Sequence, residues 1–163
     1  MPAHGVLHIH SAPPALCPHI EWATAAITGT AADMPWAAQP AAPGTLRADL
    51  TFQAQPGAAG AIASALGTWR QLRFEVTEEP SPGCDAVRYS HTPTLGTFTA
   101  VTSANGDILI PEGKLKAAMA TAPAGGCLET ALVQLLGQAW DDELEPFRQA
   151  ADTTPTRWLT AAR

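Results

Sequence analysis

The sequence predicts an α+β fold, in which a ferredoxin-like split βαβ unit (β-α-β-β-α-β, antiparallel sheet) is followed by a β-hairpin and C-terminal helices. Three observations lead to this class. Segments of alternating apolar and polar residues are separated by helix-like segments in that order. An Asn-Gly pair lies between two later strand-like segments, and apolar residues recur at helical spacing near the C-terminus. The 163 residues suit one domain, with the unit at 1–79 and an extension at 80–163 packed on it.

Alternation defines the strands of the first unit. Segments 5–11, 46–54 and 72–77 place apolar side chains on one face and polar side chains on the other. A further short strand is expected before the turn at 39–44, which contains two prolines and a glycine. These strands would form a sheet with one apolar and one polar face.

Two helices complete that unit. Pro18 suits the first position of a helix that continues to about Thr28, with Gly29 as its C-terminal stop and Cys17 as its N-cap. After Pro56-Gly57, an alanine-rich helix is expected through Ile62, Leu66 and Trp69.

Residues 80–83, Pro-Ser-Pro-Gly, are the best candidate boundary between the unit and its extension. A strand is then expected at 86–90, followed by a hairpin of 97–103 with 107–110, whose central residues Asn105 and Gly106 would both take positive φ. Further expected elements are helices at 112–121 and 127–140, a kink or new turn at Pro146, and a short docked helix through Trp158 and Leu159.

Composition narrows the class of partner. A net charge of −6 argues against a protein that binds nucleic acid or an anionic membrane. There is no apolar run of the length that a membrane span needs, and the first residues lack a basic signal-peptide region. We therefore expect a cytoplasmic protein with reduced thiols.

Seven stretches resemble one protein family over nearly the whole chain. They are GVLHIHSAP (5–13), ALCPHIEWA (15–23), QPAAPGT (39–45), LRFEVTEE (72–79), RYS (88–90), NGDILIPE (105–112) and WDDELE (140–145). The chain resembles the actinobacterial family known as domain of unknown function 3145, which has no established reaction. The resemblance implies a cytosolic actinobacterial protein linked to type II fatty-acid synthesis. His8 departs from the family pattern, which has an aromatic residue there.

A cysteine and two histidines are the candidate catalytic residues. As the N-cap of a helix, Cys17 would lie at the positive end of the helix dipole, which lowers a thiol pKa, and His10 or His19 would act as its base. The alternative is that Cys17 is a small buried apolar residue, as most free cysteines are.

The same region offers ligand types that zinc accepts, namely His8, His10, Cys17 and His19, but their spacing matches no recognised zinc motif. The acidic run at 141–145 lacks the spacing of a calcium loop. We expect neither a metal nor a cofactor.

The polar face of the sheet is the candidate ligand site. His10, Arg47, Arg73 and Glu75 would all project from it, and the residues after Pro82 would cover part of it. Covered arginines either form an anion-binding pocket or pair with carboxylates, and pairing is favoured because buried charges must be paired.

The sequence contains neither a phosphate-binding glycine loop nor a serine nucleophile elbow. The leading hypothesis is therefore a non-enzymatic binding or regulatory domain that acts through a protein partner or a small ligand. The alternatives are a small enzyme that uses Cys17, His10 and His19, and a homo-oligomer joined through the open sheet face or edge.

Overall fold

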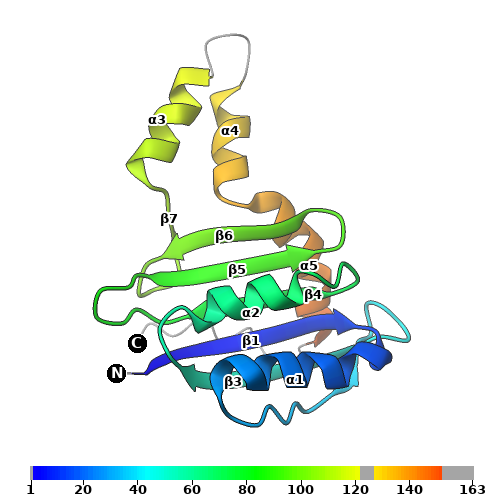
Figure 1. Ribbon diagram of the computed structural model, residues 1–163. Helices are drawn as coiled ribbons and strands as arrows, with labels where there is room; N and C mark the ends of the chain where they lie inside the picture. The colour runs from blue at the N-terminus through cyan, green and yellow to red at the C-terminus, as the bar shows by residue number, and fades with distance from the viewer. Residues whose placement is uncertain (1, 122–126, 152–163) are drawn as a thin grey trace.

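A seven-stranded antiparallel sheet forms the centre of the computed structural model, which describes residues 2–121 and 127–151 (Figure 1). The strands are β1 (Ala3–Ala12), β2 (Ala37–Ala38), β3 (Leu46–Ala54), β4 (Arg73–Glu78), β5 (Ala86–Thr92), β6 (Gly96–Thr102) and β7 (Ile108–Leu109). The helices are α1 (Cys17–Thr28), α2 (Ala58–Leu66), α3 (Glu112–Thr121), α4 (Leu128–Leu135) and α5 (Gln138–Ala151). The α+β class expected from the sequence is confirmed.

The strands lie in the order β2-β3-β1-β4-β5-β6-β7, and every neighbouring pair is antiparallel. β1 is therefore flanked by β3 and β4, which follow it in the chain. α1 lies in the connection from β1 to β2, and α2 lies in the connection from β3 to β4.

The apolar core lies between one face of this sheet and the helices α1 and α2, which cover that face (Figure 1). Alternation places Leu7 and Ile9 of β1 and Phe74 and Val76 of β4 on this side, where they are almost completely buried. Ile20 of α1 joins the same cluster. The apolar faces predicted for the strands are thus the faces that form the core.

A β-bulge near the end of β1 changes which side of the sheet its last residues face. The pairing of β1 with both neighbours shifts after Ile9, so β1 carries one extra residue relative to β3 and β4. His10 and Ser11 lie at this bulge, and both are buried. Bulges redirect side chains, and this one gives the polar face two consecutive residues from one strand.

The turn at 80–83 continues the sheet. It connects β4 to β5, which pair directly beyond it, and Ser81 and Cys84 exchange two backbone hydrogen bonds of 3.0 and 2.8 Å. Residues before and after this turn therefore belong to one continuous sheet.

The predicted hairpin is present, but its turn differs from the expectation. Gly106 has a φ of 85°, whereas Asn105 does not take a positive φ. The Ser103 N–H donates to Asp107 O, and the Gly106 N–H donates to Ser103 O. This longer loop needs only one left-handed residue, so the expectation of two was wrong.

The helix expected at 127–140 is interrupted at Gly137, which has a φ of 70°. A side chain at this glycine would overlap the ring of Phe98 on β6. The backbone can therefore pass this close to β6 only with glycine at position 137. Pro146 lies inside α5, which continues through it. Trp158 and Leu159, expected in a short helix, lie outside the described residues.

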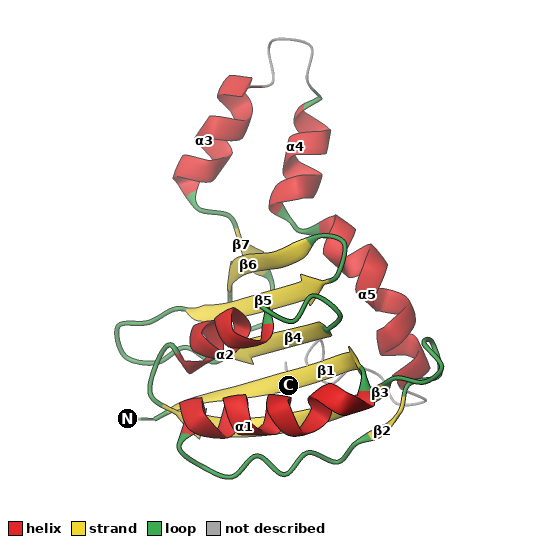
Figure 2. Cartoon of the chain, turned by 45° about the vertical axis from the view of Figure 1, so that its right-hand side comes forward, coloured by secondary structure: helices red, strands yellow, loops and turns green. Residues whose placement is uncertain are grey.

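α5 lies on the opposite face of the sheet from α1 and α2, against β1 and β5 (Figure 2). α3 and α4 pack against each other and project beyond the β6–β7 end of the sheet (Figure 1). We call this pair of helices, residues 112–121 and 128–135, the arm. Within the described residues, no helix has the length and apolar character needed to cross a membrane.

Candidate functional site

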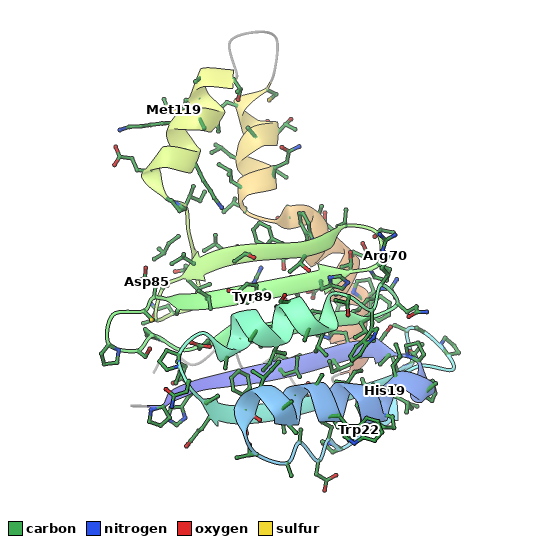
Figure 3. All side chains as sticks on the ribbon, in the orientation of Figure 1. His19, Trp22, Arg70, Asp85, Tyr89 and Met119 are labelled. Carbon is green, nitrogen blue, oxygen red and sulfur yellow. The ribbon has the colours of Figure 1, made fainter. Side chains whose placement is uncertain are left out.

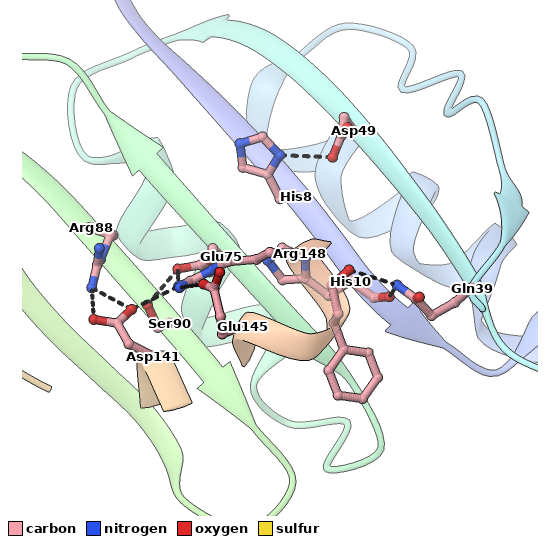
Figure 4. Close-up of polar contacts among 11 residues, drawn as sticks. His8, His10, Gln39, Asp49, Glu75, Arg88, Ser90, Asp141, Glu145 and Arg148 are labelled. Atoms are coloured by element: carbon pink, nitrogen blue, oxygen red, sulfur yellow. Dashed lines mark hydrogen bonds and ion pairs between the residues drawn. The ribbon is translucent and has the colours of Figure 1, made fainter. Parts of the chain in front are cut away.

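A buried polar cluster occupies the sheet face under α5 (Figure 4). Glu75 of β4 lies at its centre and is 2% exposed. His10 Nε2 of β1 lies 2.8 Å from Glu75 Oε2, and the Ser90 hydroxyl of β5 donates to Glu75 Oε1 at 3.2 Å. Three neighbouring strands therefore bring polar side chains to one carboxylate, as the alternation of each strand requires.

α5 supplies the positive charge of this cluster. Arg148 donates from Nε to Glu75 Oε2 at 3.0 Å and from Nη2 to Glu75 Oε1 at 2.5 Å. It also donates to Asp141 at 2.9 Å and to Glu145 at 3.3 Å. Helical spacing places Asp141, Leu144 and Arg148 on the side of α5 that faces the sheet, and Leu144 is completely buried there.

The pairing fixes the charge of both partners. Burial opposes the ionisation of Glu75, but the hydrogen bond from His10 and the ion pair with Arg148 outweigh it, so the pKa of Glu75 lies well below its usual value. Burial also disfavours the charged form of Arg148, yet its bonds to Glu75 and Asp141 raise its pKa above the ordinary value. Both groups are therefore charged at neutral pH.

Further arginines of the sheet contact the same helix. Arg88 of β5 lies 3.3 Å from Asp141. Arg73 of β4 lies 3.6 Å from Glu143, and its guanidinium lies 4.5 Å from the centre of the Phe147 ring. Ion pairs therefore connect α5 to the sheet in addition to apolar contacts such as that of the buried Leu144.

This arrangement leaves little room for chemistry at Glu75. Each of its carboxylate oxygens already accepts two hydrogen bonds. Oε2 accepts them from His10 and Arg148, and Oε1 accepts them from Ser90 and Arg148. In the part of the chain that the structure describes, no group of three or more His, Cys, Asp or Glu side chains could hold a metal ion. The contacts of the cluster connect α5 to the sheet.

His8 of β1 lies beside this cluster. Its Nδ1 is 2.8 Å from Asp49 Oδ1 on β3, and its ring stacks with that of His10 at 6.2 Å between centres. The hydrogen bond from His8 lowers the pKa of Asp49. Asp49 itself is exposed, so this pair lies at the solvent boundary of the polar face.

Cys17 lies on the other face of the sheet, in the apolar core. Its thiol is 3.7 Å from Pro13 O, and burial, with the nearby Glu21 carboxylate, raises its pKa. The N-cap of α1 is Leu16 rather than Cys17, because residues 14–16 already form a 3-10 turn that continues into the helix. The expected N-cap role of Cys17 was therefore wrong, and its surroundings raise the thiol pKa instead of lowering it.

The structure does not bring the three candidate catalytic residues together. His10 points into the cluster under α5, whereas Cys17 packs beneath α1. His19 is exposed, and its ring lies edge-on to that of Trp22 at 5.2 Å between centres (Figure 3). The sheet thus separates the thiol from His10, and the candidate zinc ligands are separated in the same way.

The four residues predicted to bind a ligand do not all lie in one site either. His10 and Glu75 are bonded to each other, and Arg73 lies beside them against α5. Arg47 lies on β3, where its Nε donates to Ala38 O at 3.4 Å, and it takes no part in the described cluster. Sequence reasoning missed Arg148, although its spacing of seven residues from Asp141 placed both on one side of a helix.

The arm carries a different kind of surface. Eight large apolar side chains are conspicuously exposed among the described residues, and six of them lie on the arm or at its base. These six are Leu109, Leu115, Met119, Leu128, Val133 and Leu136. Large continuous apolar regions are rare on the surfaces of monomeric proteins, and those that occur usually mark contact surfaces.

Two depressions lie near β6. One, of about 380 Å³ between α2 and β5–β6, is lined by small and hydroxyl-bearing residues, including Ser64, Tyr89 and Thr99, with no charged side chain. The other, of about 110 Å³ at the base of the arm, is lined by Leu109, Leu135, Lys114 and their neighbours. The second depression continues the apolar surface of the arm.

Comparison with known proteins identifies the family. No curated protein and no solved structure matches the chain. One family does match, over residues 6–161, and therefore over nearly the whole chain. The resemblance noted from the sequence is thus confirmed: the chain belongs to the family described as "Protein of unknown function (DUF3145)".

Proposed function

We propose that this chain is a non-enzymatic protein-binding domain and that the arm is its contact surface. The observation that carries the proposal is the concentration of exposed apolar side chains on the arm, which projects from the sheet (Figure 1). Met119 is 56% exposed, Val133 42% and Leu136 41%. Covering such side chains with a partner removes apolar surface from water, which is the main favourable contribution to most protein association.

The polar cluster under α5 supports a binding role over a catalytic one. The oxygens of Glu75 are occupied by His10, Ser90 and Arg148, and Cys17 is buried with a raised pKa. A catalytic nucleophile needs a lowered pKa and a base within hydrogen-bond distance, and Cys17 has neither among the described residues. A small ligand at His10, Arg73 and Glu75 would require α5 to leave the sheet.

The family resemblance supplies an expectation about the role and the compartment. We propose that the chain acts in the cytoplasm and that its role is linked to fatty-acid synthesis. The free thiols of Cys17, Cys84 and Cys127 are compatible with a reducing compartment. Cells quenched in acid and alkylated in denaturant, where all three thiols are accessible, should show all three reduced; an oxidised fraction would argue against the cytoplasm.

Site-specific photo-crosslinking tests the proposed surface. A photoreactive amino acid replaces Met119 on α3 in one variant and Gln53 on β3, also exposed but distant from the arm, in the control. In the native host, we expect position 119 to give a crosslinked product with one protein identified by mass spectrometry, and position 53 to give none. A folded chain that gives no product at position 119, or the same products at both positions, would overturn the proposal.

We also propose that residues 3–78 form a ferredoxin-like unit. The order β4-β1-β3-β2, the two crossover helices on one face and the antiparallel pairing support this assignment. β2 is its least regular part, because it pairs with β3 through only Ala37 and Ala38. An experimental structure in which residues 37–38 lie away from β3 would contradict the assignment.

A further inference from the structure

We propose that the partner of the arm is a second copy of this chain, and that two arms pack antiparallel about a twofold axis into a four-helix bundle. This inference rests on the proposed function, because it names the occupant of the same surface. It is carried by the apolar stripes of both helices and by the distribution of charge along the arm.

Each helix of the arm has an outward apolar stripe besides its inner contact. On α3, Leu115 and Met119 lie one turn apart and are 36% and 56% exposed, whereas Ala118 is buried. On α4, Val133 lies one turn before Leu136, which directly follows the helix, and both are exposed. Two helices with apolar inner and outer sides form half of a four-helix bundle, and a second identical pair completes it.

The charge of the arm favours a second copy. The whole chain carries −6, but the arm has two glutamates and two lysines, Lys114 and Lys116, which are the only lysines of the chain. Two acidic copies repel each other over most of their surfaces. The electrically neutral arm is where they can meet at the least electrostatic cost.

The positions of these charges set the direction of pairing. Lys114 lies at the start of α3, near the sheet, and Glu129 lies at the start of α4, at the far end of the arm (Figure 1). Within the described residues, neither of them forms an ion pair. In an antiparallel pair of arms, Glu129 of each copy lies beside Lys114 of the other, which gives two complementary contacts per dimer.

Sedimentation of the full chain over a wide range of concentration tests the dimer. We expect a monomer–dimer equilibrium, and Met119→Glu should raise the dissociation constant by about tenfold or more, because it places a charge in the apolar contact. The control is Leu95→Glu, which changes another exposed apolar side chain (40%) outside the arm and should leave the equilibrium unchanged. Circular dichroism verifies that both variants remain folded.

Charge exchange tests the direction of pairing. Lys114→Glu and Glu129→Lys should each weaken the dimer by about fivefold, since exposed ion pairs contribute modestly. The two substitutions combined in one chain should restore it, because the exchanged charges again meet across the axis. A double variant no tighter than either single variant would overturn the antiparallel arrangement.

The two proposals fail in distinguishable ways. A chain that stays monomeric at every concentration, but whose position 119 crosslinks to a different protein, overturns the dimer and leaves the protein-binding function standing. A monomeric chain with no crosslink at position 119 overturns both. A crosslink between two copies at position 119 supports both.

Discussion

Arg148 of α5 and Glu75 of β4 share two hydrogen bonds, at 3.0 and 2.5 Å, across 73 residues of sequence. Arg148 is 6% exposed and Glu75 2%, so water cannot replace either partner. The mutual attraction of such a pair is largely offset by the cost of removing both charges from water, so its net contribution is small. Replacing only one of the two partners is different, because the charge of the other then stays buried without its partner.

Arg148→Met should therefore lower the free energy of unfolding by about 3–5 kcal/mol, because it leaves Glu75 charged and without its main partner. Urea unfolding followed by circular dichroism measures the change. The matched control is Lys116→Met, which breaks the exposed ion pair with Glu112 on α3 and should cost at most about 1 kcal/mol. Equal losses in the two variants would show that α5 is not held by Arg148.

The same pair predicts a dependence of stability on pH. The pKa of Glu75 is held below its ordinary 4.5, so the folded state binds this proton less readily than the unfolded state. The contribution of the Glu75 charge is then fully present above about pH 4.5 and is lost as the pH falls through the lower folded pKa. Glu75→Gln should destabilise the chain at neutral pH, and the difference from wild type should narrow in acid.

Urea unfolding of both proteins at about pH 7 and about pH 3.5 checks this sign. Glu112→Gln, at an exposed position, serves as the control and should show little difference at either pH. A difference between wild type and Glu75→Gln that widens in acid would mean that the pKa of Glu75 is raised rather than lowered.

The strands of the first unit could be predicted because their signal is local. Leu7 and Ile9 alternate with polar neighbours, and the same alternation holds in β3 and β4, so each strand reveals its core face without knowledge of its partner. The predicted polar faces also placed His10 and Glu75 on the same side of the sheet. Arg47 shares that face, but β3 lies beyond β1 from Glu75, and a pattern within one strand does not contain the strand order.

The contacts of α5 could not be predicted because they depend on distant residues. The apolar periodicity around Leu132 and Leu136 continues past Gly137, and only the ring of Phe98, on another strand, shows why the helix stops there. Likewise, nothing near Arg148 in the sequence identifies Glu75 as its partner. Local sequence patterns predict secondary structure, whereas the partners of a buried ion pair depend on the tertiary fold.

The three cysteines should differ in reactivity. Backbone hydrogen bonds from Thr130 and Glu129 lower the pKa of the exposed Cys127, whereas burial raises the pKa of Cys17. We expect iodoacetamide to label Cys127 first, the exposed Cys84 next and Cys17 last, as followed by mass spectrometry of peptides. In denaturant the three rates should converge. Labelling of Cys17 as fast as that of Cys127 in the folded chain would favour the enzymatic alternative.

Glu78 should stabilise the start of α2. Its two carboxylate oxygens accept hydrogen bonds from the backbone N–H groups of Gly57, at 2.7 Å, and Ala59, at 2.9 Å, and the side chain is 4% exposed. A carboxylate at this position satisfies two otherwise unpaired donors and lies at the positive end of the helix. Glu78→Ala should therefore lower the free energy of unfolding by about 1–3 kcal/mol.

The adjacent Glu79 provides the control, because it is exposed and its side chain accepts no hydrogen bond from a described residue. Glu79→Ala should change stability by less than about 0.5 kcal/mol. Hydrogen exchange separates the two explanations of a loss at Glu78. If the carboxylate acts as a cap, the amides of α2 exchange faster in Glu78→Ala than those of α1; if it acts only through overall charge, Glu79→Ala has the same effect and both helices respond alike.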